Sequence, residues 1–117
     1  MVSEEDVRRV ALSLPGAVEK SYNRLPGFRV SQKLFARIHE QPDTLFVGCA
    51  DVAEKDGLIA SHPDKFFTTP HYDGYPGLLV RLNAVDIDEL TELLTESWRL
   101  SASRRRVAEF DAARPRP

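Results

Sequence analysis

The sequence predicts an α+β protein in which helices cover one face of a single antiparallel sheet of about five to six strands. Apolar residues recur with helical spacing near both ends of the chain, whereas the middle alternates with a period of two. Strands that follow one another through short turns are antiparallel, and amphipathic helices need an apolar surface to cover. We therefore expect the order helix, three or four strands, helix, two strands, helix.

The first helix is predicted from its two ends. Ser3 precedes Asp6 by three residues, which resembles a capping box, and Pro15-Gly16 stops the apolar periodicity. A second, shorter helix is expected over about 51–60, where Gly57 weakens the helical propensity.

The third helix has the strongest signal. Asp86 and Glu89 have the spacing of a capping box, and the helix is expected to run to about Leu100. Its apolar stripe consists of Ile87, Leu90, Leu93 and Leu94.

A β-hairpin is predicted over 28–38. Its tip lacks the Asn-Gly or Asp-Gly dipeptide that favours a two-residue turn, so we expect a three-residue loop, Ser31-Gln32-Lys33. This loop places one apolar set inward: Phe28, Val30, Leu34, Ala36 and Ile38. It places Arg29, Phe35 and Arg37 outward, on a face at least partly exposed to water. Further strands are expected at 44–49 and 78–82, with shorter ones at 18–22 and 66–68.

Composition limits the classes of function. The 117 residues are 42% hydrophobic with a net charge of −2, which fits one globular domain over 1–110 followed by a flexible Arg/Pro tail over 111–117. No apolar run is long enough for a membrane helix, and the first residues do not resemble a signal peptide, so we expect a cytoplasmic protein. One cysteine and three scattered histidines predict neither a disulfide nor a metal site, and no cofactor motif is present.

Charge is unevenly distributed along the chain. The segment 20–38 has five basic residues and no acid, and 99–117 has six arginines. With Lys33 at its tip, the hairpin would be a basic ribbon of the kind that enters a DNA groove. The predicted DNA contacts are Arg29, Lys33, Phe35, Arg37, Arg104, Arg105 and Arg106. Segregated charges are equally expected if they only solvate their faces.

The segment 68–77 is the alternative site. His71, Tyr72 and Tyr75 bring a proton-transfer group and two hydroxyls into one loop, which would suit binding of a small molecule or a protein. The same residues are also typical of a stiff turn. No nucleophile elbow, phosphate loop or acid pair occurs, so we expect no enzymatic activity. Cys49, at the start of a helix, is expected to be a buried hydrophobe rather than a reactive thiol.

Several segments resemble the MmcQ/YjbR family of small bacterial proteins. They are LSLPGAVE at 12–19, FRVSQKLFAR at 28–37, His62-Pro63, TPHYDGYP at 69–76 and LVRL at 79–82. The resemblance implies a two-layer, frataxin-like fold with a curved antiparallel sheet described as a double wing, and presumed binding of DNA. By position, it marks Glu19, Lys33, Phe35, His71, Tyr72, Tyr75, Pro76 and Arg81 as family residues. Arg81 thereby joins the candidate ligand-binding residues of the 68–77 loop.

Overall fold

The computed structural model describes residues 2–113 as one six-stranded sheet with four α-helices. The α-helices are α1 (Glu4–Ser13), α2 (Val52–Ser61), α3 (Ile87–Ser101) and α4 (Arg104–Ala113). The strands are β1 (Val18–Tyr22), β2 (Leu25–Val30), β3 (Lys33–Ile38), β4 (Thr44–Gly48), β5 (Phe66–Phe67) and β6 (Gly77–Arg81). Short 3-10 turns occupy Pro70–Tyr72 and Leu82–Ala84. All neighbours pair antiparallel, in the order β1-β2-β3-β4-β6-β5, which confirms the predicted α+β class.

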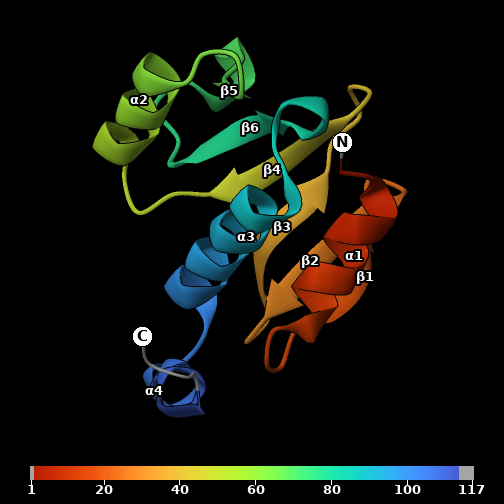
Figure 1. The fold of residues 1–117 in the computed structure, drawn as a ribbon, viewed down its shortest axis with the longest axis vertical. Helices are drawn as coiled ribbons and strands as arrows, with labels where there is room; N and C mark the ends of the chain where they lie inside the picture. Colours follow the sequence, from red (N-terminus) through yellow and green to blue (C-terminus); the bar gives the residue numbers. More distant parts are fainter. Residues whose placement is uncertain (1, 114–117) are drawn as a thin grey trace.

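The main core lies between the helices and one face of the sheet. Figure 1 shows α1 and α3 lying next to each other over the strands, with α2 over the β5–β6 end. Leu45, Val80, Leu90 and Leu94 are completely buried between these layers. Ile87, expected in the same stripe, is 39% exposed because it occupies the first turn of α3, beyond the edge of the core. No helix within the described residues is long and apolar enough to cross a membrane.

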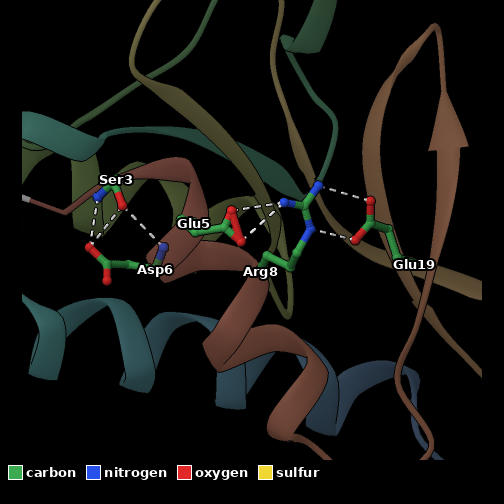
Figure 2. Close-up of polar contacts among 5 residues, drawn as sticks. All are labelled: Ser3, Glu5, Asp6, Arg8 and Glu19. Atoms are coloured by element: carbon green, nitrogen blue, oxygen red, sulfur yellow. Dashed lines mark hydrogen bonds and ion pairs between the residues drawn. The ribbon is translucent and has the colours of Figure 1, made fainter.

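The helix α1 is fixed at both its start and its outer face (Figure 2). Ser3 and Asp6 form the reciprocal capping box that the sequence indicates. The guanidinium of Arg8 donates to Glu5 on its own helix and to Glu19 on β1, with an Nε–Oε1 distance of 2.8 Å to Glu19. Arg8 therefore ties α1 to the edge strand.

The hairpin of β2 and β3 differs from the prediction at its tip. Its turn has two residues, because Ser31 and Gln32 both adopt positive φ (51° and 66°), the backbone of a type I′ turn, and Val30 pairs with Lys33. The pairing of Phe28 with Ala36 is as predicted, because β3 contains a bulge that restores the register.

The extra residue of this bulge is Phe35, and its side chain lies in the main core together with Phe28. The prediction that Phe35 points outward is therefore wrong, as is the inward position of Leu34, which lines the opposite face. The bulge is stabilised from α3, since the Ser97 hydroxyl donates to the Phe35 carbonyl and accepts from the Gly48 N–H.

The C-terminal segment folds as helix α4, which the sequence did not predict. Its Phe110 packs against the buried ring of Trp98 at 5.0 Å, and the Trp98 indole donates to the Pro15 carbonyl. Helix α4 extends beyond the predicted domain end at 110, because residues 111–113 are helical. The rest of the predicted tail, 114–117, lies outside the described residues.

Candidate ligand-binding hollow

The second face of the sheet, turned away from α1 and α3, is basic. Alternation along the strands places four cations on it: Lys20, Arg29, Arg37 and Arg81, each from a different strand. The acidic Glu19 has the opposite parity and bonds to α1 instead. This face therefore has a positive potential that the net charge of the chain does not reveal.

The segment 68–77 covers part of this basic face. Tyr72 is buried and stacks on Phe46 of β4, with ring centroids 5.3 Å apart, and both contact Leu79 of β6. His71 meets the Tyr72 ring edge-on at 4.9 Å and is itself exposed. The three predicted loop residues His71, Tyr72 and Tyr75 thus lie together.

A buried lysine holds this segment in place. Lys55, on α2, is only 2% exposed, and its ammonium donates to the carbonyl oxygens of Tyr72 (2.6 Å) and Tyr75 (3.0 Å). The Cys49 N–H donates to the Pro76 carbonyl at 2.8 Å. Sequence reasoning missed Lys55, because lysine is rarely buried and α2 has no clear apolar stripe.

Arg37 is the central cation of the site. Its side chain is held by three acceptors: the Tyr72 hydroxyl (2.8 Å), the Glu40 carboxylate (2.9 Å) and the Ile38 carbonyl (3.3 Å). Its guanidinium also lies over the Tyr22 ring, 4.7 Å from the centroid. The prediction placed Arg37 on the correct face but as an exposed ribbon residue, whereas it is buried and 6% exposed.

These side chains surround a hollow of about 310 Å³, here called the sheet-face hollow. It is lined by Tyr22, Asn23, Leu34, Arg37, Phe46, His71, Tyr72 and Tyr75. None of these eight residues is acidic. A shallower depression next to it shares Arg37, His71 and Tyr72 and reaches Glu40 and His39. The sheet-face hollow combines one fixed guanidinium, an exposed imidazole, hydroxyl groups and several aromatic rings.

The rim of the depression is close to neutral around pH 7. The Arg37 guanidinium hydrogen-bonds to Glu40 and lowers the pKa of that carboxyl, so that Glu40 stays ionised and compensates Arg37. Burial lowers the pKa of His39, whose Nδ1 accepts from the Gln41 N–H at 3.1 Å. His39 is therefore neutral at pH 7.

The predicted DNA contacts do not lie together: Arg37 lines the sheet-face hollow and Phe35 is in the main core, whereas the others lie apart from the hollow, at one end of the molecule. Lys33 is exposed beside the β2–β3 turn, and Arg29 is half-buried next to it. The Arg106 guanidinium lies over Gly16, just before the start of β1, which pairs with the end of β2 at Arg29. Figure 1 accordingly shows α4 at the end of the sheet to which the hairpin tip points. Arg104 and Arg105 are exposed on α4, where Arg105 pairs with Glu109.

Arg81 and Cys49, two further residues singled out in the sequence, do not line the sheet-face hollow. Arg81 is exposed on the basic face, with its guanidinium 4.1 Å from the centroid of Phe67, outside the sheet-face hollow. Cys49 is buried, and burial followed by the Glu54 carboxylate raises the pKa of its thiol to about 11. Cys49 is therefore a thiol, not a thiolate, at neutral pH.

The fold and the hollow define a small α+β protein whose sheet is covered by helices on one face and carries a polar site on the other. The family model described as YjbR matches residues 12–100, and the chain belongs to that family. It is 35% identical to the uncharacterized proteins Mb2600 of Mycobacterium bovis and Rv2570 of Mycobacterium tuberculosis, over 94% of this chain and 96% of each relative.

A solved structure supports the same fold. The crystal structure of Deinococcus radiodurans protein DR2400, with the family-model domain DUF419, superimposes with a TM-score of 0.73 at 22% identity. The match covers 95% of this chain and 89% of that one.

Proposed function

We propose that the protein binds a small organic anion with a flat ring in the sheet-face hollow, as a binding protein without catalysis. The observation that carries this proposal is the buried guanidinium of Arg37 on the floor of the hollow, fixed by Tyr72 and Glu40. A guanidinium is flat, permanently charged and suited to carboxylate and phosphate groups. Its position is set before any ligand arrives, which reduces the entropic cost of binding.

The other residues around the hollow suit both the anionic group and the flat ring of the proposed ligand. His71 and Tyr75 are exposed at the mouth, where they offer hydrogen-bond donors to an anionic group. Tyr22, Phe46 and Tyr72 offer ring faces and edges for a flat apolar body. Lys20 and Arg29, on the same face of the sheet, attract an anion toward the hollow.

The test is a titration followed by two-dimensional amide NMR with phenyl phosphate, benzoate and the neutral analogue phenol. We expect the two anions to shift the resonances of His71 and Tyr75, and phenol to bind at least about tenfold more weakly, since one charge-assisted hydrogen bond is worth about 1.5–3 kcal/mol. His71→Ala and Tyr75→Ala, at exposed positions, should weaken the anions without unfolding the protein. Equal binding of phenol and benzoate would contradict the proposal.

Arg37→Lys tests the shape of the cation. The substitution keeps the charge and loses the flat fork, so affinity for phenyl phosphate should fall. Arg105→Lys, on exposed α4, is the matched control and should leave the affinity unchanged. A variant Arg37→Lys that folds and binds as the wild type does would exclude Arg37 as the anion-binding residue.

Nucleic-acid binding is a second candidate, favoured by the contact of Arg106 with Gly16. This contact brings the arginines of α4 to the same end as Arg29 and Lys33. The logarithm of the affinity for duplex DNA should then fall linearly with the logarithm of the salt concentration, with a slope of about −0.9 per phosphate contact. Arg29→Ala with Lys33→Ala should flatten the slope by about 2. Absence of salt-dependent binding at low ionic strength would contradict nucleic-acid binding, but it would not bear on the proposed anion site in the sheet-face hollow.

A further inference from the structure

We propose a second binding site, for an organic monocation with an apolar body, in the cleft between α2 and α3 on the helix-covered face of the sheet. This interhelical cleft has a volume of about 280 Å³ and is separated from the sheet-face hollow by the sheet itself. Its class of ligand follows from two features, an apolar floor and a negatively charged rim. The proposal is independent of the anion site.

The floor of the interhelical cleft is a part of the main core that no helix covers. Figure 1 shows α2 over the β5–β6 end and α3 crossing β3 and β4, so that the two helices part where the neighbouring strands β4 and β6 meet. The floor and walls consist of Val47, Cys49, Leu58, Phe66, Leu78 and Leu93. Binding of an apolar group to such a surface is favourable, because it removes both apolar surfaces from water.

Four carboxylates form the rim, and two of them have a cation nearby. Glu89 pairs with Lys65, and Glu96 lies 3.4 Å from Arg99. Glu54 on α2 and Glu92 on α3 have no ion pair within residues 2–113, and they stand on the two opposite walls. The Lys55 ammonium forms no ion pair with either of them, because it is bonded to the carbonyl oxygens of Tyr72 and Tyr75.

The exposed side chain of Glu54 lines the cleft, and its carboxylate also acts on the Cys49 thiol. It raises the pKa of the Cys49 thiol, second only to the effect of burial. Cys49 is part of the floor, so the field of Glu54 reaches the apolar surface on which a ligand would rest. An ammonium group placed between Glu54 and Glu92 would be stabilised by both carboxylates.

The volume and polarity of the interhelical cleft limit which ligands can bind in it. A volume of about 280 Å³ lies near the lower end for small-molecule sites, which suits one ring or a short alkyl chain. Anions would be repelled by the rim. Extended polyamines would place charge on the apolar floor, where desolvation disfavours it. A primary amine on an aromatic or alkyl body satisfies both features.

The test uses three probes with one aromatic body: 2-phenylethylammonium, neutral 2-phenylethanol and anionic 3-phenylpropionate. In an NMR titration of the full chain, the cation should shift the amide resonances of Gly48, Cys49 and Leu93. We expect binding in the order cation, alcohol, anion. Equal affinity of the cation and the alcohol would overturn the proposal, as would shifts confined to other parts of the protein.

Charge-removing variants locate the ammonium group. Glu54→Gln and Glu92→Gln should each raise the dissociation constant of the cation about threefold, as expected for partly exposed ion pairs. Asp56→Asn, on α2 but outside the cleft, is the matched control and should not change it. An equal loss in Asp56→Asn would reveal a general effect of net charge and overturn the site.

A variant that fills the interhelical cleft tests the site without changing its charge. Leu93→Trp places a larger ring in the half-buried wall of the cleft. It should abolish binding of 2-phenylethylammonium while far-ultraviolet circular dichroism stays that of the folded protein. If Leu93→Trp unfolds the chain, Leu58→Phe serves the same purpose from the opposite wall. Unchanged binding in a folded filled variant would overturn the proposal.

Discussion

The ammonium of Lys55 donates a hydrogen bond to the backbone carbonyl of Tyr72 at 2.6 Å, across the boundary between α2 and the segment 68–77. A lysine that binds backbone carbonyls fixes the path of the chain and leaves the Tyr72 hydroxyl free to contact Arg37. The geometry of the sheet-face hollow thus depends on a residue that does not line it.

Lys55→Met should lower the free energy of unfolding by about 1–3 kcal/mol, because it removes the two hydrogen bonds that the buried ammonium donates to the carbonyl oxygens of Tyr72 and Tyr75, which then keep only their backbone donors. Urea unfolding monitored by Trp98 fluorescence measures this change. The control, Lys20→Met at an exposed position, should stay within about 0.5 kcal/mol. Equal stabilities of the Lys55 variant and the wild type would show that the Lys55 contacts are not needed.

Leu90→Ala should destabilise the protein by about 2–5 kcal/mol, because Leu90 is completely buried between α3 and the sheet. Ile87→Ala, on the exposed first turn of the same helix, should cost much less. Thermal unfolding of both variants checks the difference. Similar losses at the two positions would contradict the way α3 is docked.

Replacing Ser31-Gln32 by Asn-Gly should raise the free energy of unfolding by about 1 kcal/mol. Both residues have positive φ, which costs most side chains roughly that amount or more and which asparagine and glycine adopt readily. Gln41→Gly, where φ is not positive, serves as the control and should bring no gain. A loss of stability on replacing Ser31-Gln32 would argue for the three-residue loop.

Cys49 should react slowly with thiol reagents. At pH 8 its pKa of about 11 leaves on the order of a hundredfold less thiolate than in a free cysteine with a pKa of about 8.5. Ellman's reagent should therefore label the native protein far more slowly than the urea-unfolded chain. Equal rates would mean that Cys49 is not buried in solution.

Acid should weaken the contact between α1 and β1. The Arg8 guanidinium holds the pKa of Glu19 below its usual value, so the folded state binds its proton less readily than the unfolded chain does. The contribution of this pair to stability is then present above about pH 4.3 and is lost as the pH falls through the lowered pKa. Unfolding measured from pH 6 to pH 2 should show a smaller acid-induced loss in Glu19→Gln than in the wild type.

Local signals made the helices α1 and α3 predictable, whereas the hairpin depended on a contact distant in sequence. The caps at Ser3 and Asp86 each need only a partner three residues away. The bulge at Phe35 is accompanied by a hydrogen bond from Ser97, which lies 62 positions further on. Two-residue alternation cannot reveal such a bulge, so the facing of Leu34 and Phe35 was predicted wrongly.

The sequence indicated several residues of the site but not the contacts that bring them together. The local cluster of His71, Tyr72 and Tyr75 indicated a polar site, and the structure brings these three residues together. The partnership of Arg37 with Tyr72 spans 35 positions and required the segment 68–77 to fold over β3 and β4. Helix α4 was missed because its apolar contacts, Val107 and Phe110, are too few to form a clear stripe.

The two outer strands of the sheet bear on whether copies of this protein aggregate. At one side β5 offers only the two residues Phe66 and Phe67. At the other, β1 has Glu19 and Lys20 in its centre. A foreign strand would find too short a backbone to pair with on the first side and would have to accommodate charged side chains on the second. The shortness of β5 and the charges of β1 thus oppose growth of the sheet by strand addition.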